Sequence, residues 1–283
     1  MLEILASDPR AWGQDRTRWT LAALRDGVPT YWEYSLSGLW RILAGHRLRS
    51  KRARDHIRSP DPAYSEKVAY LATIRAAVEA GPADAVLLYE DEVTYYRQPS
   101  LASGYAPVGS ADPRAERSTR SNATTRVIGA LNAHTGRVVA RQRTKIDVPA
   151  LIRFYQALVA AYPGRRIYLS MDNWPVHFHP DVLAALEPQT SPFPFLVPRH
   201  WPTVPSPQAR RLNLPIQLVP LPTYAPWLNP IEKLWRKLKQ DVLHLHRLAD
   251  DLPCLRALVL NFLARFDGDS PDLLRYVGLP IPT

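Results

Sequence analysis

Two patterns of hydrophobic and polar positions alternate along this chain, and together they predict an α/β fold. Short runs of apolar or β-branched residues predict strands, and longer segments with apolar residues three and four positions apart predict amphipathic helices. The predicted strands cover residues 85–89, 124–131, 137–144, 166–171 and 216–219. The sequence NAHTG between the second and third runs is typical of a hairpin turn, so the first three strands are expected to form an antiparallel meander. Three strands followed by alternating helices and strands indicate a mixed five-stranded sheet with helices on both faces.

The predicted helices include one whose amphipathic pattern is especially clear. Helices are expected over residues 15–26, 35–44, 64–80, 148–162 and 180–186, and a last one starts near residue 229 and runs to about residue 242. In this last helix the apolar residues share one face, while Lys233, Arg236 and Lys237 lie on the other. This basic face is directed to solvent or to a polyanion, and we expect its three residues to contact DNA. Asn229 is its expected N-cap, and Pro230 suits the first helical position, where a missing N–H costs nothing.

A strongly basic segment follows the first two helices. Its basic residues are Arg47, Arg49, Lys51, Arg52, Arg54 and Arg58. Two short helices and a basic arm suit a partial helix-turn-helix that contacts DNA phosphates, although a helical pair with a solvated run of charges explains the pattern equally well. The proline-rich break at residues 59–63 predicts a linker. We therefore expect a DNA-binding region over residues 1–60, a linker and connecting helix over residues 61–83, and a main α/β domain over residues 84–283.

Residues 187–211 are too rich in proline for a regular helix or a central strand. Of the 28 prolines in the chain, 11 lie between Pro188 and Pro226, so residues 187–211 are predicted to be a loop insertion in the main domain. This composition fits a segment that clamps DNA or a partner, and it fits a surface loop without a function equally well.

Composition and charge narrow the class of protein. A chain of 283 residues can bury a substantial core, and its net charge of +10 favours a polyanionic partner, with nucleic acid as the first candidate. The single cysteine, Cys254, excludes an internal disulfide framework, so a reducing cytoplasm is the expected setting. The N-terminal sequence lacks the pattern of a signal peptide, and the uncharged stretch at residues 212–231 contains too many prolines to span a membrane.

Acidic residues stand at three comparable places in the predicted sheet. Asp91 and Asp172 follow apolar strands, and Glu232 opens the helix after the last strand. Because the carboxyl ends of adjacent strands lie together, these side chains can converge although they are far apart in sequence. Such carboxylates suit two Mg²⁺ ions, which take oxygen ligands and promote in-line phosphoryl transfer. A simpler interpretation makes Glu232 part of a capping box on Asn229, and the acidic run at residues 90–92 a solvated strand end.

Three segments resemble a known protein family. They are LLYEDEVTYY at residues 87–96, IYLSMDNWPVH at residues 167–177 and LPTYAPWLNPIEKLWRKLK at residues 221–239. These resemble the signature blocks of bacterial insertion-sequence DDE transposases of the mariner-like superfamily, and residues 126–139 resemble the second and third strands of that family. The resemblance implies an RNase H-like fold in which Asp91, Asp172 and Glu232 are the catalytic, metal-binding residues. The accompanying motif positions are Glu92, Asn173, His177, Asn229 and Pro230.

The resemblance also implies a reaction and its partners. It predicts a transposase that cuts transposon ends and joins their 3′-hydroxyls to target DNA with two Mg²⁺ or Mn²⁺ ions, as a homodimer on double-stranded DNA. An RNase H-like nuclease without strand transfer and a domesticated DNA-binding protein are the alternatives. Two departures stand out: Asp172 and Glu232 are 60 positions apart, which the proline-rich insertion explains, and family members usually carry a further helix-turn-helix upstream.

Overall fold

The predicted strands form one sheet at the centre of the larger of two structural units. The computed structural model describes residues 1–51 and 58–281, which divide into the units Met1–His56 and Ile57–Thr283. The strands are β1 (Ala85–Tyr96), β2 (Thr124–Asn132), β3 (Val138–Arg143), β4 (Arg166–Met171) and β5 (Ile216–Pro220). Their order across the sheet is β3-β2-β1-β4-β5; β1, β2 and β3 pair antiparallel, and β4 and β5 run parallel to β1. The expected RNase H-like mixed five-stranded sheet is therefore confirmed.

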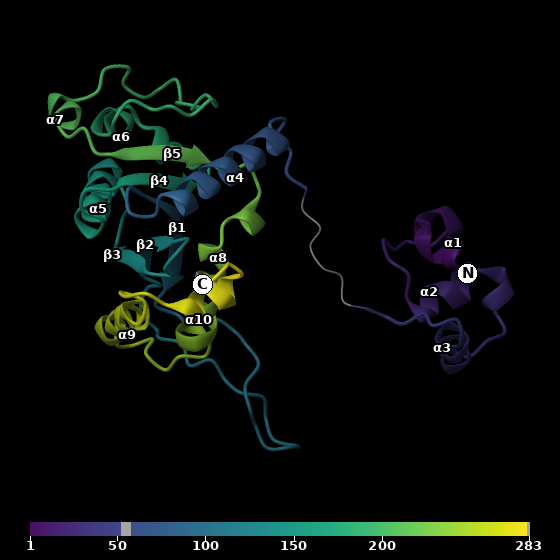
Figure 1. Cartoon of the computed structure of the whole chain (residues 1–283). Coiled ribbons are helices and arrows are strands. Elements are labelled where there is room, and N and C mark those ends of the chain that lie inside the picture. Colours follow the sequence, from purple (N-terminus) through teal and green to yellow (C-terminus); the bar gives the residue numbers. More distant parts are fainter. Residues whose placement is uncertain (52–57, 282–283) are drawn as a thin grey trace. The chain divides into compact units, whose positions relative to one another are not determined.

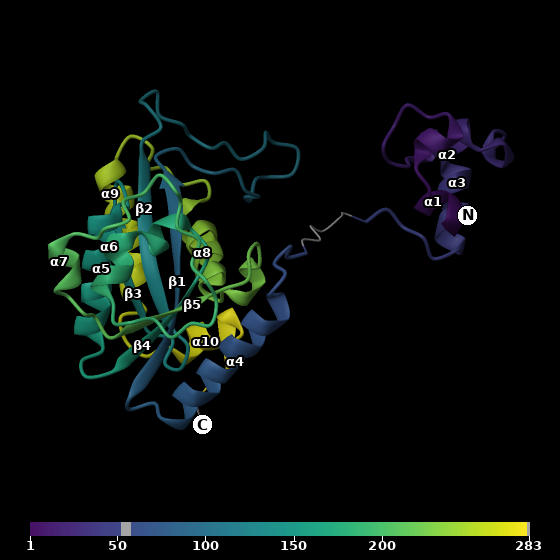
Figure 2. The same ribbon diagram turned by 90° about the horizontal axis from the view of Figure 1, so that it is seen from above.

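Helices cover both faces of this sheet (Figures 1 and 2). One face packs against α5 (Val148–Ala161) and α6 (Pro180–Ala185), and the other against α4 (Tyr64–Ala80), α8 (Ile231–Leu238), α9 (Leu252–Ala264) and α10 (Pro271–Val277). Strand β1 contributes to both cores, because successive side chains point to opposite faces. Val86 and Leu88 belong to the core under α5, and Leu87 and Tyr89 to the core under α8.

Strand β1 is longer than its apolar run predicts. The pattern predicts that the apolar run ends at residue 89 and that the acidic residues stand at the C-terminal end of the strand, but the strand continues through residues 90–92 to Tyr96. The reason is its partner: β2 pairs with β1 along this whole stretch, with Asp91 opposite Gly129 and Tyr96 opposite Thr124. The acidic residues are therefore held within the sheet.

Helix α8 also begins differently from the prediction. It starts at Ile231, with Pro230 at the N-cap, and no side chain makes a capping hydrogen bond there. Asn229 is therefore not the side-chain cap; its Nδ2 instead donates to the backbone oxygen of Glu90 at 2.9 Å. The helix continues into a π-helical turn, Lys239–Leu243, which accounts for the long amphipathic pattern.

The N-terminal unit is a small group of helices. It contains α1 (Leu2–Ala6), α2 (Leu21–Gly27) and α3 (Leu36–Gly45), with short 3₁₀ turns at Pro9–Trp12 and Pro29–Tyr31. The helix predicted over residues 15–26 begins only at Leu21, because the Thr20 hydroxyl accepts a hydrogen bond from the Ala23 N–H and caps it there. Arg47, Arg49 and Lys51 follow α3, and Arg49 and Lys51 are exposed. Arg52 and Arg54 lie outside the described residues.

The proline-rich insertion is irregular, as predicted, apart from the short helix α7 (Pro207–Arg210). Its first residues line the outer edge of β5: Gln189 donates to the Ile216 carbonyl and accepts from the Leu218 N–H. Further along, Phe195 stacks on Phe178, with ring centroids 5.0 Å apart. The insertion therefore begins as a cover for an open sheet edge. None of the helices in residues 1–51 and 58–281 is long and apolar enough to cross a membrane.

Candidate active site

The sheet brings the three predicted acidic residues together. In the parallel pairing, Tyr89 lies opposite Ser170, and Asp91 and Asp172 each follow two residues later on neighbouring strands. Strand β5 lies beside β4, and the loop after it leads to α8, which carries Glu232 in its first turn. All three carboxylates line one cavity of about 420 Å³.

Asp91 is held by a buried tryptophan from α8. Trp235 donates its indole N–H to Asp91 Oδ2 at 3.0 Å, and Trp235 itself is 1% exposed. Burial raises the pKa of Asp91 to about 8, and the negative charges of Glu232, Glu92 and Asp172 act in the same direction. Near neutral pH this carboxyl group therefore binds a proton unless a cation replaces it.

Asp172 lies in a more open position, directly after β4. Its side chain is 56% exposed, and its Oδ1 accepts a hydrogen bond from the Trp174 N–H at 2.8 Å. Partial burial works to raise the pKa of Asp172, but His177 and the Trp174 N–H outweigh it, and the pKa is lowered. Asp172 is therefore the acid of this set that stays ionised most readily.

The pKa of Glu232, like that of Asp91, is raised above its usual value. Burial raises its pKa, and Asp172 adds to this, while Lys239 and Arg236 oppose the rise. Since no side chain caps α8, the capping-box alternative for Glu232 has no support in the hydrogen bonds of this helix. Its carboxylate instead faces the cavity with Asp91 and Asp172.

The cavity has the chemistry of a site for a hard divalent cation. Among the ion pairs of the described residues, none joins Asp91, Asp172 or Glu232 to a lysine or arginine. Asn229 lines the same cavity, and its Oδ1 is buried without a hydrogen-bond partner. Carboxylate and amide oxygens are the donors that Mg²⁺ and Mn²⁺ take in proteins, so this donor set fits such an ion.

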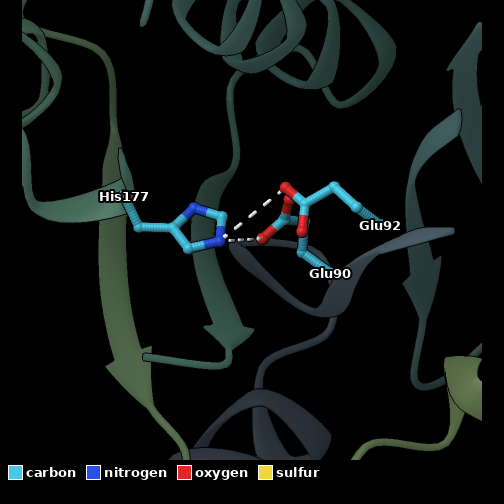
Figure 3. A group of neighbouring side chains, drawn as sticks. All are labelled: Glu90, Glu92 and His177. Atoms are coloured by element: carbon cyan, nitrogen blue, oxygen red, sulfur yellow. Dashed lines mark ion pairs between the residues drawn. The ribbon is translucent and has the colours of Figure 1, made fainter. Parts of the chain in front are cut away.

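Another predicted motif residue, Asn173, joins the elements around the cavity. Asn173 Nδ2 donates to the Leu221 carbonyl at 2.8 Å and to Thr223 Oγ1 at 3.3 Å, and thereby ties the end of β4 to the loop after β5. Glu92 and His177 lie close to Glu90 (Figure 3). Because side chains alternate along a strand, this group is on the opposite side of β1 from Asp91.

Sequence reasoning missed Asp61, which fastens the same loop. Asp61 Oδ2 accepts hydrogen bonds from the Thr223 N–H and from Lys67 Nζ, at 2.9 and 2.8 Å. The pair is almost buried, with the Asp61 and Lys67 side chains 5% and 12% exposed. Burial opposes ionisation, but these bonds hold the pKa of Asp61 at about 2. In the sequence, Asp61 is only a polar residue in the proline-rich break before a helix, and this pattern predicted a linker.

The predicted DNA-contacting residues of α8 differ in how they are engaged. Lys233 donates to the Val277 carbonyl at 2.7 Å, and Lys237 forms an ion pair with Asp241 at 2.9 Å. Arg236 is exposed and lines a groove that borders the cavity. Arg58, near the start of the larger unit, is also exposed.

The chain is similar to known proteins in sequence and in fold. The family model for DDE superfamily endonucleases matches residues 86–256. The chain is 23% identical over 278 residues to the insertion element IS630 uncharacterized 39 kDa protein of Shigella sonnei, covering 96% of this chain and 73% of that protein.

Solved structures of similar fold include two complexes of Mos1. A pre-cleavage Mos1 transpososome matches with a TM-score of 0.58 and 15% identity, covering 94% of this chain and 77% of that one. The Mos1 mariner paired-end complex with Mn matches with a TM-score of 0.57, at the same identity and coverage. At this identity the likeness establishes the fold.

Proposed function

Because this chain belongs to the DDE superfamily of endonucleases, we propose that it is a transposase that cuts the ends of an insertion element and joins them to target DNA. The observation that carries the proposal is the convergence of Asp91, Asp172 and Glu232 on one cavity in a chain with a net charge of +10. The basic charge suits a DNA substrate, and the carboxylates suit metal-dependent phosphoryl transfer.

In this proposal, Asp91, Asp172 and Glu232 hold Mg²⁺ or Mn²⁺. Two such ions would supply activation of the attacking water or 3′-hydroxyl and charge stabilisation at the leaving oxygen. The Trp235 indole N–H orients Asp91, and Asn173 positions the loop that forms one wall of the cavity. Asn229 presents its unpartnered Oδ1 to the same space.

Plasmid assays with the full chain test this function. A supercoiled plasmid that carries both ends of the element is incubated with Mg²⁺, with Mn²⁺ and with EDTA, in the presence of a second, target plasmid. We expect metal-dependent cleavage and joined products. Cleavage without joining would make the protein a nuclease, and DNA binding without cleavage would make it a DNA-binding protein that has lost the chemistry.

The exposed basic residues after α3 are proposed to bind DNA phosphates. Charge reversal in the variants Arg49→Glu and Lys51→Glu should weaken binding to all DNA sequences and lower the log–log salt slope by about 0.9 for each phosphate that is no longer neutralised. Arg10→Glu is a matched control in the same unit, because the Arg10 charge is already offset by Asp8. An unchanged slope in the two variants would identify this segment as a solvated run of charges.

Joining two transposon ends requires that both be held at once, and the related Mos1 protein was solved as a paired-end complex. We therefore propose that the chain acts as a homodimer on double-stranded DNA in the cytoplasm, with residues 1–60 as its DNA-binding region. Light scattering of the protein with and without end DNA tests this assembly, and a complex with one chain per DNA end pair would contradict it.

A further inference from the structure

A second acidic cluster lies on the other side of β1 from the cavity. Because side chains alternate along a strand, Asp91 points to the face that carries Trp235, while Glu90 and Glu92 point to the face that carries α5. There they meet His177, which comes from the turn after β4 (Figure 3). None of these three side chains lines the 420 Å³ cavity.

The ligand atoms of this cluster surround one point. His177 Nε2 is 3.5 Å from Glu90 Oε2 and 3.8 Å from Glu92 Oε1, and the three ligand atoms lie within 4.8 Å of one another. These separations are too long for direct hydrogen bonds. Zn²⁺ bonds to nitrogen and carboxylate oxygen are about 2.0–2.2 Å long, which puts neighbouring ligand atoms around a tetrahedral ion roughly 3.3–3.6 Å apart.

The cluster is buried and its polar atoms lack partners. Glu90 is 0% exposed, and neither of its carboxylate oxygens has a hydrogen-bond partner; Glu92 Oε1 and His177 Nε2 also have none. Buried polar groups of this kind are costly unless something pairs with them. A cation among these atoms removes the cost.

The imidazole of His177 is oriented to act as a ligand. Its Nδ1 lies 3.2 Å from the Tyr155 hydroxyl. In the tautomer that donates from Nδ1 to this hydroxyl, the Nε2 lone pair is directed at the carboxylates. Asp172 Oδ1 lies 3.6 Å from the same Nε2 and belongs to a half-exposed side chain. The Asp172 carboxylate therefore lies between the buried cluster and the open cavity, and an ion can reach the cluster from the cavity past this side chain.

We propose that Glu90, Glu92 and His177 form a binding site for one divalent transition-metal ion, with Zn²⁺ as the best fit. Mg²⁺ is disfavoured because it takes oxygen rather than imidazole nitrogen. The bound ion neutralises two buried carboxylates and ties β1 to the turn after β4, so its role is structural. The site does not use Asp91 or Glu232, and it stands whether or not the chain cleaves DNA.

The test is direct metal binding by the full chain. The protein is stripped with a chelator, then loaded with Co²⁺ as a visible probe in the presence of excess Mg²⁺, which occupies all-oxygen sites. We expect one Co²⁺ per chain, an absorption spectrum of a low-coordinate ion with a nitrogen ligand, and a rise in the thermal midpoint. Zn²⁺ should displace the Co²⁺ and abolish the spectrum.

Matched variants locate the ion. Glu90→Gln and His177→Gln should lose the Co²⁺ and the thermal shift, whereas Asp91→Asn and Glu232→Gln should keep both. His246→Gln is the control, because His246 is also buried with an unpartnered Nε2 but, within the described residues, has no carboxylate in ion-pair distance. It should bind Co²⁺ normally.

Several outcomes would overturn the proposal: no Co²⁺ bound, binding that survives both Glu90→Gln and His177→Gln, or loss of binding in Asp91→Asn and Glu232→Gln alone. If Glu90→Gln and His177→Gln do not fold, the location of the ion is tested in the unaltered protein, loaded with one Mn²⁺ per chain in the presence of excess Mg²⁺. Spin-echo coupling of Mn²⁺ to an imidazole nitrogen supports the site, and an all-oxygen environment rules it out.

Discussion

The two sides of β1 at residues 90–92 show how one acidic run produces two different environments. On one side, Asp91 joins Asp172 and Glu232 around an open cavity. On the other, Glu90 and Glu92 meet His177 inside the core under α5. The strand period of two separates neighbours in the sequence onto opposite faces, so adjacent acidic residues need not share a role.

Exposure distinguishes these environments. The Asp172 side chain is 56% exposed, whereas that of Glu90 is fully buried. An open site can exchange ions readily and admit a DNA strand, whereas a buried site has room for an ion but not for a DNA strand. This difference suits the open side of β1, with Asp91, Asp172 and Glu232, to catalysis. It suits the closed side, with Glu90, Glu92 and His177, to a structural ion.

The largest expected effect is loss of cleavage when the open side is altered. Asp91→Asn and Asp172→Asn each remove an anionic ligand, so Mg²⁺-dependent plasmid cleavage should fall by orders of magnitude. The double variant should lose little more, because the two acids act as a unit. Asp267→Asn, an exposed acid elsewhere, is the control. Substantial cleavage by Asp91→Asn would break the assignment of catalysis to this side.

Metal binding to the open side should depend on pH. The pKa of Asp91, raised from 3.8 to about 8, means that below pH 8 an ion must displace a proton. Apparent Mn²⁺ affinity should therefore increase from pH 6 to pH 8, approaching about tenfold per pH unit. Asp91→Asn should flatten this dependence. Titration calorimetry in buffers of different ionisation enthalpy measures the proton release, and its absence would contradict the protonated state of Asp91.

A smaller effect, on the free energy of unfolding, is expected around Trp235, whose indole N–H donates to Asp91. Gly129 lies opposite Asp91 on β2, and a Cβ there would come within 2.7 Å of the Trp235 ring. Gly129→Ala should overpack this region and lower the free energy of unfolding by about 1–3 kcal/mol. In the control, Gly268→Ala, the added methyl meets nothing within 4 Å. Denaturant titration compares the two, and equal stabilities would show that the indole can move aside.

The smallest effect is expected for the stability of Glu232→Gln. Glu232 makes no capping hydrogen bond in α8, so the substitution loses only its interaction with the helix dipole. The free energy of unfolding should change by at most about 1 kcal/mol. A larger loss in denaturant titration would restore Glu232 to a structural role at the start of the helix.

Much of the fold followed from local patterns in the sequence. The helix over residues 64–80 and the strand over residues 166–171 have the predicted bounds, because each has a clear period and a sharp stop. The length of β1 did not follow, because its acidic residues interrupt the apolar pattern and only pairing with β2 keeps them in the strand. The helices α9 and α10 were also not predicted.

The positions of the three acidic residues were predictable, because the strand order alone determines which strand ends lie together. Equivalent positions on parallel strands place Asp91 and Asp172 side by side, and their convergence with Glu232 follows from the strand order; the catalytic role of the three remains a prediction. The burial of Glu90 against His177 and the bond from Asp61 to Thr223 depend on contacts between segments far apart in the chain. No local pattern marks such contacts.

Cleavage by Glu232→Gln tests the central claim most directly, because this residue had a purely structural alternative. The measurement compares Mg²⁺-dependent cleavage of a plasmid carrying the element's ends by the unaltered protein and by the variant, at protein concentrations that give equal DNA binding. If the open side is the catalytic centre, cleavage should fall by orders of magnitude while folding and DNA binding persist. Near-normal cleavage by the variant would contradict the account.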